Sequence, residues 1–388
     1  MNQKHLALLF FIAFLMMLGF GIIIPILPFF AEQAGASSLE IGILFASYNV
    51  MQFLFAPVWG ALSDRIGRKP LILFGLLGFS ITFILFGLAT SYTEMLVYRI
   101  LAGIVSAAAI PTVSAMVADL FPPAERARGM GVIGAGIGLS FVFGPVIGGL
   151  LSSYQFTYPF LASGGVAFVT FLVVLFALPE SLPAEQRSGQ QREKRDNPLV
   201  ALFGSLSLLY GLLFIVSFSF AGLETTFALY INDLYGFTSK DLGYMFLVMG
   251  VISAFVQGGL IGKMVKRLGE PAVLSTGLLL YAFGFLAILY ADSFWSFALN
   301  LSLFGAGQGM IRATATAMIT QRTSQGQGVT TGAVSSVDSL GRILGPLVGG
   351  AIYEWHHSGP FLLGALLMGL IFLMFRSRYR YLPQSTSQ

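Results

Sequence analysis

Five ionisable side chains lie deep within long apolar stretches of this chain: Glu224, Asp338, Arg99, Arg312 and Arg342. A charged side chain at the centre of a bilayer costs about 2.5–3.5 kcal/mol on insertion scales, so it normally faces a partner or a water-filled cavity. These residues therefore mark where the chain could move ions or recognise polar groups.

Glu224 is the most isolated acid, because its sequence neighbours are apolar and include Phe220 and Tyr230. Burial in apolar surroundings favours the protonated form of a carboxyl group. We expect Glu224 to carry a proton. The alternative is an acid that is bonded permanently to a neighbouring helix.

Asp338 and Arg342 are four residues apart, so on a helix they share one face and can pair. A neutral structural pair is one interpretation of Asp338, and a second proton site is the other. The excess of arginine would suit a polar or partly anionic substrate, or would offset Glu224. Arg99 lies one turn before Gly103, and a functional role and a structural bond to helix carbonyls are equally open for it.

The composition indicates which elements position these residues. The 388-residue chain is 56% hydrophobic and 10% charged, whereas soluble domains carry about 25% charged residues. Such a chain is a polytopic membrane protein. The absence of cysteine excludes disulfides, thiolate metal sites and cysteine nucleophiles. Because the sequence also shows no metal-ligand cluster and no phosphate-binding loop, we expect no cofactor and no enzyme activity.

Twelve apolar runs are long enough to cross a bilayer, which takes about 20 residues. They are 6–30, 39–63, 70–90, 95–118, 128–152, 158–178, 199–231, 240–262, 272–291, 294–320, 329–353 and 359–375. We interpret the first run as a spanning helix and not as a cleaved signal peptide, because it continues past Pro25 and Pro28 and lacks a small-residue cleavage site. The predicted fold is an all-α membrane protein with twelve transmembrane helices.

Basic residues follow the alternation of the loops. Of the 21 Lys and Arg residues, 17 fall in loops on one side, Lys240 falls on the other, and the three embedded arginines make up the rest. Loops rich in Lys and Arg face the cytoplasm, so both termini are expected there. This distribution explains the pI of about 9.2 without a nucleic-acid partner.

The runs fall into two sets of six. We expect an N-terminal bundle over 1–178, a polar cytoplasmic linker over 179–198 and a C-terminal bundle over 199–388. Motifs recur at an offset of 201 residues: the run from Gly144-Pro145 to Gly149 matches the run from Gly345-Pro346 to Gly350. Two parallel, pseudo-symmetric six-helix bundles are typical of secondary transporters, which hold substrate between their halves.

These segments together resemble the major facilitator superfamily, and within it the twelve-helix drug:proton antiporters. The charged turn from Gly60 to Lys69 is similar to the family signature between helices two and three. The other matching segments are Arg99 with Gly103, Gly144-Pro145 with Gly148-Gly149, Leu18 to Pro28, and Asp119 to Pro122 with Arg126. Ser140 stands where the antiporter signature usually has a glycine.

Within that group the chain looks most like multidrug exporters of the NorA/Bmr type. The segments that carry this likeness are Phe218 to Glu224 and Met310 to Arg312. The chain departs from the type in three respects: Gly309 replaces an acid, Asp338 and Arg342 are additional charges, and Met16 and Met17 replace the acid that tetracycline exporters carry in the first helix.

The resemblance implies a proton-coupled antiporter that exports amphipathic small molecules by alternating access, as a monomer in a bacterial-type plasma membrane. The implied proton sites are Glu224 and, secondly, Asp338. The candidate substrate-binding residues are Gln52, Phe141, Phe220, Tyr230, Arg312 and Arg342. The candidate coupling and gating residues are Arg99, Gly103, Gly60, Asp64, Arg68, Asp119, Gly144 and Pro145. Asp64, Arg68 and Asp119 are expected to form a cytoplasmic latch that stabilises the outward-facing state.

Two alternatives stay open. An exporter of one specific sugar, metabolite or lipid-linked glycan is favoured by the excess of embedded arginine. A non-transporting membrane sensor or scaffold would normally need a soluble domain, for which the linker and the tail from Leu382 leave little room.

Overall fold

The computed structural model of the chain describes residues 3–183, 187, 206–323 and 327–379. All regular structure in these residues is helical. Each of the twelve predicted runs corresponds to a helix or to consecutive helices, which confirms the all-helical prediction. The predicted linker 179–198 lies mostly outside the described residues, so the expected domain boundaries stay a prediction.

Contacts divide the chain into two compact units. Unit 1 comprises Met1–Ser37, Leu44–Gln191 and Thr238–Tyr244, and unit 2 comprises Ser38–Ile43, Arg192–Phe237 and Met245–Gln388. The helices that build most of unit 1 are α1 (Gln3–Ile23), α2 (Leu27–Gln33), α3 (Ser38–Ile66), α4 (Arg68–Gly87), α5 (Tyr92–Ser106), α6 (Ala109–Leu120), α7 (Pro123–Ser152) and α8 (Thr157–Ala177).

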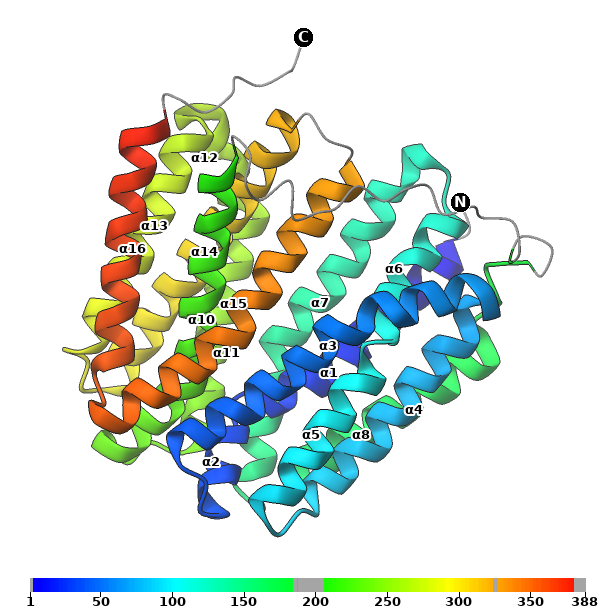
Figure 1. The fold of residues 1–388 in the computed structure, drawn as a ribbon, viewed down its shortest axis with the longest axis horizontal. Coiled ribbons are helices and arrows are strands. Elements are labelled where there is room, and N and C mark those ends of the chain that lie inside the picture. The colour runs from blue at the N-terminus through cyan, green and yellow to red at the C-terminus, as the bar shows by residue number, and fades with distance from the viewer. Residues whose placement is uncertain (1–2, 184–186, 188–205, 324–326, 380–388) are drawn as a thin grey trace. The chain divides into compact units, whose positions relative to one another are not determined.

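Unit 2 repeats this plan with a second set of long helices. They are α10 (Ser207–Tyr235), α11 (Ser239–Phe255), a π-helical turn (Val256–Leu260), α12 (Ile261–Leu268), α13 (Glu270–Ile288), α14 (Phe294–Arg322), α15 (Gln327–Trp355) and α16 (Gly359–Arg378). Within this unit α13 packs against both α14 and α16 (Figure 1), and α10 packs against α15.

Three predicted runs are interrupted helices. The first run breaks between α1 and α2, beside Pro25 and with Pro28 in the first turn of α2. Proline lacks a backbone donor and clashes with the preceding turn, so it ends or bends a helix. The fourth run breaks between α5 and α6, and the eighth widens into the π-helical turn between α11 and α12.

Glycine-to-backbone contacts hold the equivalent helix pair of each unit together. In unit 1 a Cβ atom on Gly144 of α7 would lie 2.7 Å from the carbonyl carbon of Gly21 on α1. In unit 2 a Cβ atom on Gly345 of α15 would lie 2.2 Å from the carbonyl oxygen of Phe218 on α10. The α1–α7 and α10–α15 pairs therefore need glycine for the same steric reason, which agrees with the 201-residue repeat.

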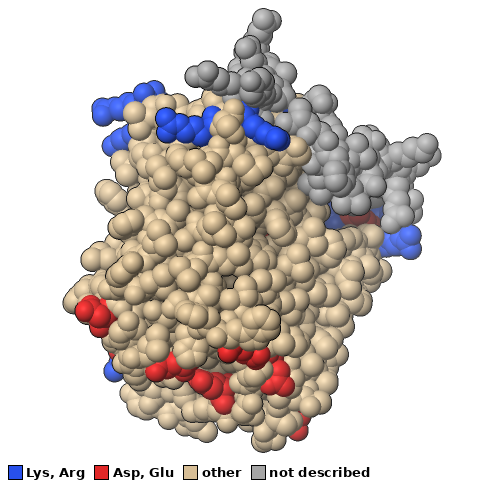
Figure 2. Space-filling view, turned by 60° about the vertical axis from the view of Figure 1, so that its left-hand side comes forward, with Lys and Arg blue, Asp and Glu red and all other residues tan. Residues whose placement is uncertain are grey.

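Ten spans among the described residues are long and apolar enough to cross a membrane. Neither α14 nor α15 is among these ten, and these two helices carry Arg312, Asp338 and Arg342. On the face shown in Figure 2, Lys and Arg side chains gather at one end and most Asp and Glu side chains lie towards the other. Basic residues lie in the last turn of α12, Lys266 and Arg267, and in the last turn of α16, Arg376 and Arg378.

Candidate functional site

In unit 2, Asp338 of α15 is the centre of a cluster of charged side chains. Arg312 of α14 donates to both of its carboxylate oxygens, from Nη1 at 3.1 Å and from Nη2 at 3.2 Å. The hydroxyl of Ser217 on α10 also donates to Asp338. This two-point Arg–carboxylate geometry fixes orientation as well as charge, so three helices are joined at one acid.

Arg342 lies between two carboxyl groups without a close bond to either. Its Nη1 atom is 3.8 Å from Oε2 of Glu224, and its Nε atom is 3.7 Å from Oδ2 of Asp338. Charge-assisted hydrogen bonds are about 2.7–2.9 Å long. Arg342 is therefore shared between two acids. Asp338 has other partners, whereas the described residues supply no hydrogen bond to Glu224.

The members of this cluster differ in accessibility. The Glu224 side chain is 8% exposed and that of Asp338 is 21% exposed, whereas Arg342 and Arg312 reach 28% and 51%. The acids are thus covered and the guanidinium groups are the accessible members. A group that enters the cluster from outside meets positive charge first.

The cluster brings together four of the residues that the sequence singled out, namely Glu224, Asp338, Arg312 and Arg342. Phe220 precedes Glu224 by one turn and is buried on α10. Tyr230 lies elsewhere, because its ring packs edge-on against Phe361 of α16, with ring centroids 4.8 Å apart.

Two residues near the charged cluster of unit 2 were not predicted from the sequence. Ser217 is a small hydroxyl residue of a kind that is common in membrane helices, and only its contact with Asp338 distinguishes it. Tyr281 of α13 is fully buried, and it interacts electrostatically with Glu224 and Arg342. No local pattern marks either residue, because both act across distances of more than 50 residues in the chain.

In unit 1, Arg99 of α5 is an embedded cation with a different environment. It is 3% exposed, and its Nε atom donates to the Leu44 carbonyl at 3.3 Å. Its guanidinium carbon lies 4.5 Å from the ring centroid of Tyr48 and 5.9 Å from that of Phe83. Within the described part of the chain no carboxylate lies in ion-pair distance of Arg99, so aromatic faces and a carbonyl stabilise its charge.

Gly103, one turn after Arg99, allows the close approach that creates this environment. A Cβ atom at Gly103 would lie 2.7 Å from the Tyr48 carbonyl oxygen and 2.8 Å from Cβ of Met51. Any larger residue would push α5 away from α3. Arg99 and Gly103 thus work together, because Arg99 supplies the charge and Gly103 allows the helix contact that buries it.

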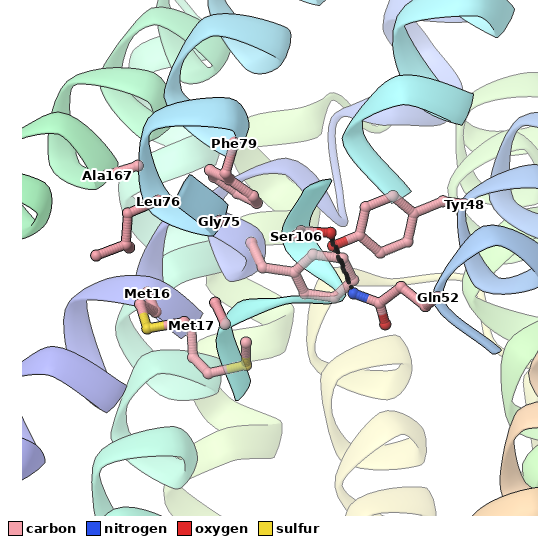
Figure 3. Close-up of a pocket in the computed structure, with 11 residues that line it drawn as sticks. Met16, Met17, Tyr48, Gln52, Gly75, Leu76, Phe79, Ser106 and Ala167 are labelled. Atoms are coloured by element: carbon pink, nitrogen blue, oxygen red, sulfur yellow. Dashed lines mark hydrogen bonds between the residues drawn. The ribbon is translucent and has the colours of Figure 1, made fainter. Parts of the chain in front are cut away.

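A small pocket lies beside the Tyr48 ring in unit 1 (Figure 3). Its lining is mostly apolar, and it includes Met16, Met17 and Phe79. A polar triad forms one side. Nε2 of Gln52 donates to the Tyr48 hydroxyl at 3.0 Å and to the Ser106 hydroxyl at 3.3 Å, and Ser106 donates to Tyr48 at 2.9 Å.

This composition suits amphipathic molecules, because ligand pockets are typically apolar with a few placed polar groups. Flexible methionine side chains also adapt to ligands of different shape. Gln52 lines the pocket as a candidate binding residue should. Phe141 is 37% exposed on α7 and is not among the lining residues. Pro145 lies inside α7, next to the Gly144 contact described above.

The charged turn between α3 and α4 forms a compact network at one end of unit 1. Arg68 donates to Asp64 from Nη1 at 2.6 Å, to Asp119 from Nε at 2.9 Å and to the Ser63 hydroxyl from Nη1 at 2.5 Å. Only 7% of the Arg68 side chain is exposed. The structure therefore brings the three predicted latch residues together around one guanidinium group. Gly60, one turn before Asp64, accepts a hydrogen bond from Ser63 at 2.7 Å.

Glu180 completes this network and was not predicted. Its carboxylate accepts from the backbone amides of Arg68 at 2.9 Å and Lys69 at 3.2 Å, which are free amides of the first turn of α4. Gly67 precedes that turn with φ of 107°, a conformation that favours glycine, and a Cβ atom there would lie 2.4 Å from Glu180. A carboxylate at a helix N-terminus is favoured by the helix dipole.

The described residues contain no group of three His, Asp or Glu side chains that could hold a metal ion. They contain a covered carboxyl group and a shared guanidinium group in unit 2, and a mostly apolar pocket in unit 1.

Comparisons with known proteins agree with this geometry. The family model of the Major Facilitator Superfamily matches residues 9–271 and 258–387. Multidrug resistance protein 2 of Bacillus subtilis is 32% identical over 373 residues, which cover 92% of this chain and 90% of that protein. Quinolone resistance protein NorA of Staphylococcus aureus is 26% identical over 381 residues, which cover 97% and 98% of the two chains.

A solved structure supports the fold. The crystal structure of the human organic anion transporter MFSD10 (TETRAN) is 27% identical, has a TM-score of 0.70, and is matched over 96% of this chain and 99% of that one. The charged α3–α4 turn, the paired bundles and the family match lead to one conclusion: the chain is a multi-pass membrane transporter and belongs to the major facilitator superfamily.

Proposed function

We propose that this transporter exports amphipathic drugs and similar small molecules in exchange for protons, by alternating access. The observation that carries the proposal is Glu224. It is a carboxyl group with an 8% exposed side chain, and its one ion-pair partner among the described residues is 3.8 Å away. Such a group can lose and regain a proton at low cost to the surrounding structure. The names of the two bacterial relatives support the substrate class.

The charges indicate how proton binding and substrate binding would be linked. When Glu224 is ionised, Arg342 is shared between two carboxylates. When Glu224 is protonated, Arg342 is attracted to Asp338 alone. A substrate that carries a donor or a positive group competes with the proton for the ionised carboxylate, and by linkage each weakens binding of the other. Asp338 would be a second proton site only if its bonds to Arg312 and Ser217 open.

The pocket of unit 1 would hold the apolar part of the substrate, with Gln52 as its polar contact. Phe141 and Phe220 are proposed to contact substrate in other states of the cycle, and Tyr230 to shape the wall near α16. Arg312 and Arg342 would recognise polar groups of the substrate, and Arg99 with Gly103 would couple the pocket to α5.

The Arg68 network is proposed to act as a latch that stabilises one state of the cycle. Gly60 would allow the α3–α4 turn to rearrange, and Gly144 with Pro145 would allow α7 to bend. The positive-inside distribution supports a cytoplasmic position for this turn and both termini, in a bacterial-type plasma membrane. We expect a monomer that needs protons and a lipid bilayer and has no nucleic-acid partner.

The test is efflux of a fluorescent amphipathic dye from proteoliposomes, with and without an imposed proton gradient. Glu224→Gln keeps the shape of the side chain but cannot ionise. We expect it to fold, to bind dye and to lose gradient-driven efflux. Wild-type levels of uphill efflux by this variant would overturn the assignment of the proton to Glu224.

A second candidate, transport of one polar or anionic solute, is supported by the 51% exposed guanidinium group of Arg312. The name of the human relative, an organic anion transporter, points the same way. A thermal-shift screen separates the two: stabilisation by a single acidic ligand favours this candidate, and weaker stabilisation by many amphipathic compounds favours drug export.

A further inference from the structure

Tyr281 is the largest fully buried side chain of the described residues, and its hydroxyl group has no hydrogen-bond partner among them. Its ring is held edge-on by Phe285 and Phe304, with centroids 5.4 Å and 5.1 Å away. Buried hydroxyl groups nearly always find a partner, because an unpaired donor in an apolar interior costs free energy. This unpaired group needs an explanation.

The position of Tyr281 is fixed by its backbone. A Cβ atom on Gly307 of α14 would lie 3.2 Å from the Tyr281 amide nitrogen and 2.9 Å from the Gly277 carbonyl oxygen. The two helices are therefore in backbone contact beside Tyr281. Because the ring is also enclosed by aromatic neighbours, the hydroxyl group cannot move far, and a partner has to come to it.

Glu224 is the group that can do so. The described residues give its carboxyl group no hydrogen bond, and its ion pair with Arg342 is 3.8 Å long. The Tyr281 hydroxyl lies within electrostatic range of both Glu224 and Arg342. A buried donor and a buried acceptor, each without a hydrogen bond, thus lie in one neighbourhood. A glutamate side chain can rotate about three bonds, whereas the Tyr281 ring is held by Phe285 and Phe304. The carboxyl group of Glu224 is therefore the group that can move.

The other charged groups of this neighbourhood are already engaged. Asp338 of α15 is held by Arg312 of α14 and by Ser217 of α10. Arg342 of α15 is shared with Glu224. Helix α16, which packs against both α13 and α10, carries its basic residues Arg376 and Arg378 in its last turn. Arg342 is thus a cation that Glu224 has to share with Asp338, and Tyr281 is a further, neutral donor that the ionised form of Glu224 can gain.

We infer that Tyr281 is a positioning residue for proton exchange: its hydroxyl group donates a hydrogen bond to the Glu224 carboxylate once the proton has left. A carboxylate accepts a stronger hydrogen bond than a protonated carboxyl group does, so this bond favours the ionised form of Glu224. Helix α13 thereby sets the pH at which Glu224 releases its proton. This inference rests on the proposed function of Glu224 as the proton carrier.

The test titrates Glu224 directly and needs no substrate. The infrared band of the protonated carboxyl group is recorded against pH for purified protein in detergent, and the Glu224 contribution is identified as the part that is absent in Glu224→Gln. Tyr281→Phe removes only the hydroxyl group. Because a hydrogen bond to a charged group is strong, we expect the pH of half-loss of the band to rise by about one unit in this variant.

A second variant reverses the direction. Tyr281→3-fluorotyrosine keeps the hydroxyl group and makes it a stronger donor, so the pH of half-loss should fall below the wild-type value. Tyr353→Phe is the matched control, because its buried hydroxyl group donates to Asp233 at 2.7 Å in the same unit. We expect Tyr353→Phe to lower the melting temperature and to leave the titration of Glu224 unchanged, whereas Tyr281→Phe should not lower the melting temperature.

The outcomes separate the inference from the function on which it rests. If no band that depends on Glu224 titrates in the wild type, the proposed proton carrier itself is wrong. If the band titrates but its midpoint is the same in wild type, Tyr281→Phe and Tyr281→3-fluorotyrosine, the proton carrier stands and Tyr281 has only a packing role.

Discussion

The two units hold the same kind of residue, an embedded arginine, in opposite environments. Arg99 in unit 1 is stabilised by the Tyr48 ring and the Leu44 carbonyl. Arg342 in unit 2 is stabilised by two carboxyl groups at 3.7 Å and 3.8 Å. Aromatic faces and backbone carbonyl groups carry no net charge at any ordinary pH, whereas a carboxyl group is either neutral or negatively charged.

This difference indicates a division of labour. The environment of Arg99 is the same at every pH of interest, so unit 1 can offer a constant pocket beside it. The environment of Arg342 changes whenever Glu224 gains or loses a proton. Under the proposed function, unit 2 would hold the parts that respond to the proton, and unit 1 holds the pocket with the apolar lining.

The largest expected effect comes from removing the acid at the centre of the unit 2 cluster. Asp338→Ala leaves the guanidinium groups of Arg312 and Arg342 and the hydroxyl of Ser217 without their shared partner. Breaking a fully buried pair from one side costs about 3–5 kcal/mol, but the Arg312 side chain is 51% exposed. We therefore expect a smaller cost of about 1–3 kcal/mol and a clear drop in the melting temperature of the detergent-solubilised protein.

The control for this variant removes the charge on both sides. Asp338→Asn combined with Arg312→Gln should recover part of the lost stability, because neither a carboxylate nor the guanidinium group of Arg312 is then left without its partner. Equal melting temperatures for wild type and Asp338→Ala would show that the cluster is not a stabilising unit.

Replacing Arg99 and Arg342 one at a time tests most directly whether their surroundings respond differently to pH. Arg342→Met leaves Glu224 and Asp338 near each other without the cation, so its stability should fall as pH rises and both acids ionise. Arg99→Met leaves no unpaired acid among the described residues. We expect its stability to follow that of wild type within about 1 kcal/mol at every pH, because losing the ring and carbonyl contacts is offset by losing a costly buried charge.

Melting curves of both variants over a range of pH provide the measurement. Parallel pH dependence for Arg342→Met and Arg99→Met would contradict the division of labour. Transport by Arg99→Met should still be impaired if Arg99 couples the pocket to α5.

A smaller effect is expected in the pocket of unit 1. Gln52→Leu keeps the approximate size of the side chain and removes the bonds to Tyr48 and Ser106. One neutral hydrogen bond contributes about 1 kcal/mol, so dye binding to purified protein should weaken about five-fold. Met17→Leu is the matched control within the same lining, and a conservative apolar exchange should change the dissociation constant less than two-fold. Equal effects of the two substitutions would remove the polar triad from the binding site.

The smallest effect is expected at the charged turn between α3 and α4, away from the surroundings of Arg99 and Arg342. The Asp64 side chain is 39% exposed and that of Asp119 is 22% exposed. Partly exposed ion pairs contribute about 0–1 kcal/mol. Asp64→Asn should therefore change stability less than Asp119→Asn, which also loses the Ser181 hydroxyl. If Asp64→Asn leaves both transport and the ratio of inward-facing to outward-facing molecules unchanged, the latch hypothesis is wrong.

Much of the candidate site could be predicted because embedded charges are rare and conspicuous in an apolar sequence. The sequence singled out Glu224, Asp338, Arg312 and Arg342, and the structure brings all four together. A pair of Asp338 with Arg342 was one of two interpretations of Asp338, and the structure has the two side chains at 3.7 Å, with a closer partner for Asp338 in Arg312. Arg312 belongs to another helix, and the periodicity of a sequence does not indicate which helices are neighbours in the fold.

Neutral side chains were the ones that sequence analysis missed. Tyr48, Ser106, Ser217 and Tyr281 are unremarkable types in a membrane helix, and their importance comes from groups on other helices. Glu180 was assigned to the linker by its polar surroundings, although it binds the first turn of α4. In each case the missing information was a contact between segments that are far apart in the chain.

The class of protein, the twelve runs, the repeat of 201 residues and the positions of the embedded charges can be read from the sequence, because hydropathy and helical periodicity are local properties. Only the folded chain shows that Arg99 faces aromatic rings, that Arg342 is shared by two acids and that the Tyr281 hydroxyl has no hydrogen-bond partner among the described residues. The physical reason is that the state of a buried charge depends on the dipoles and charges within a few ångströms of it, and in a helical bundle most of those belong to other helices.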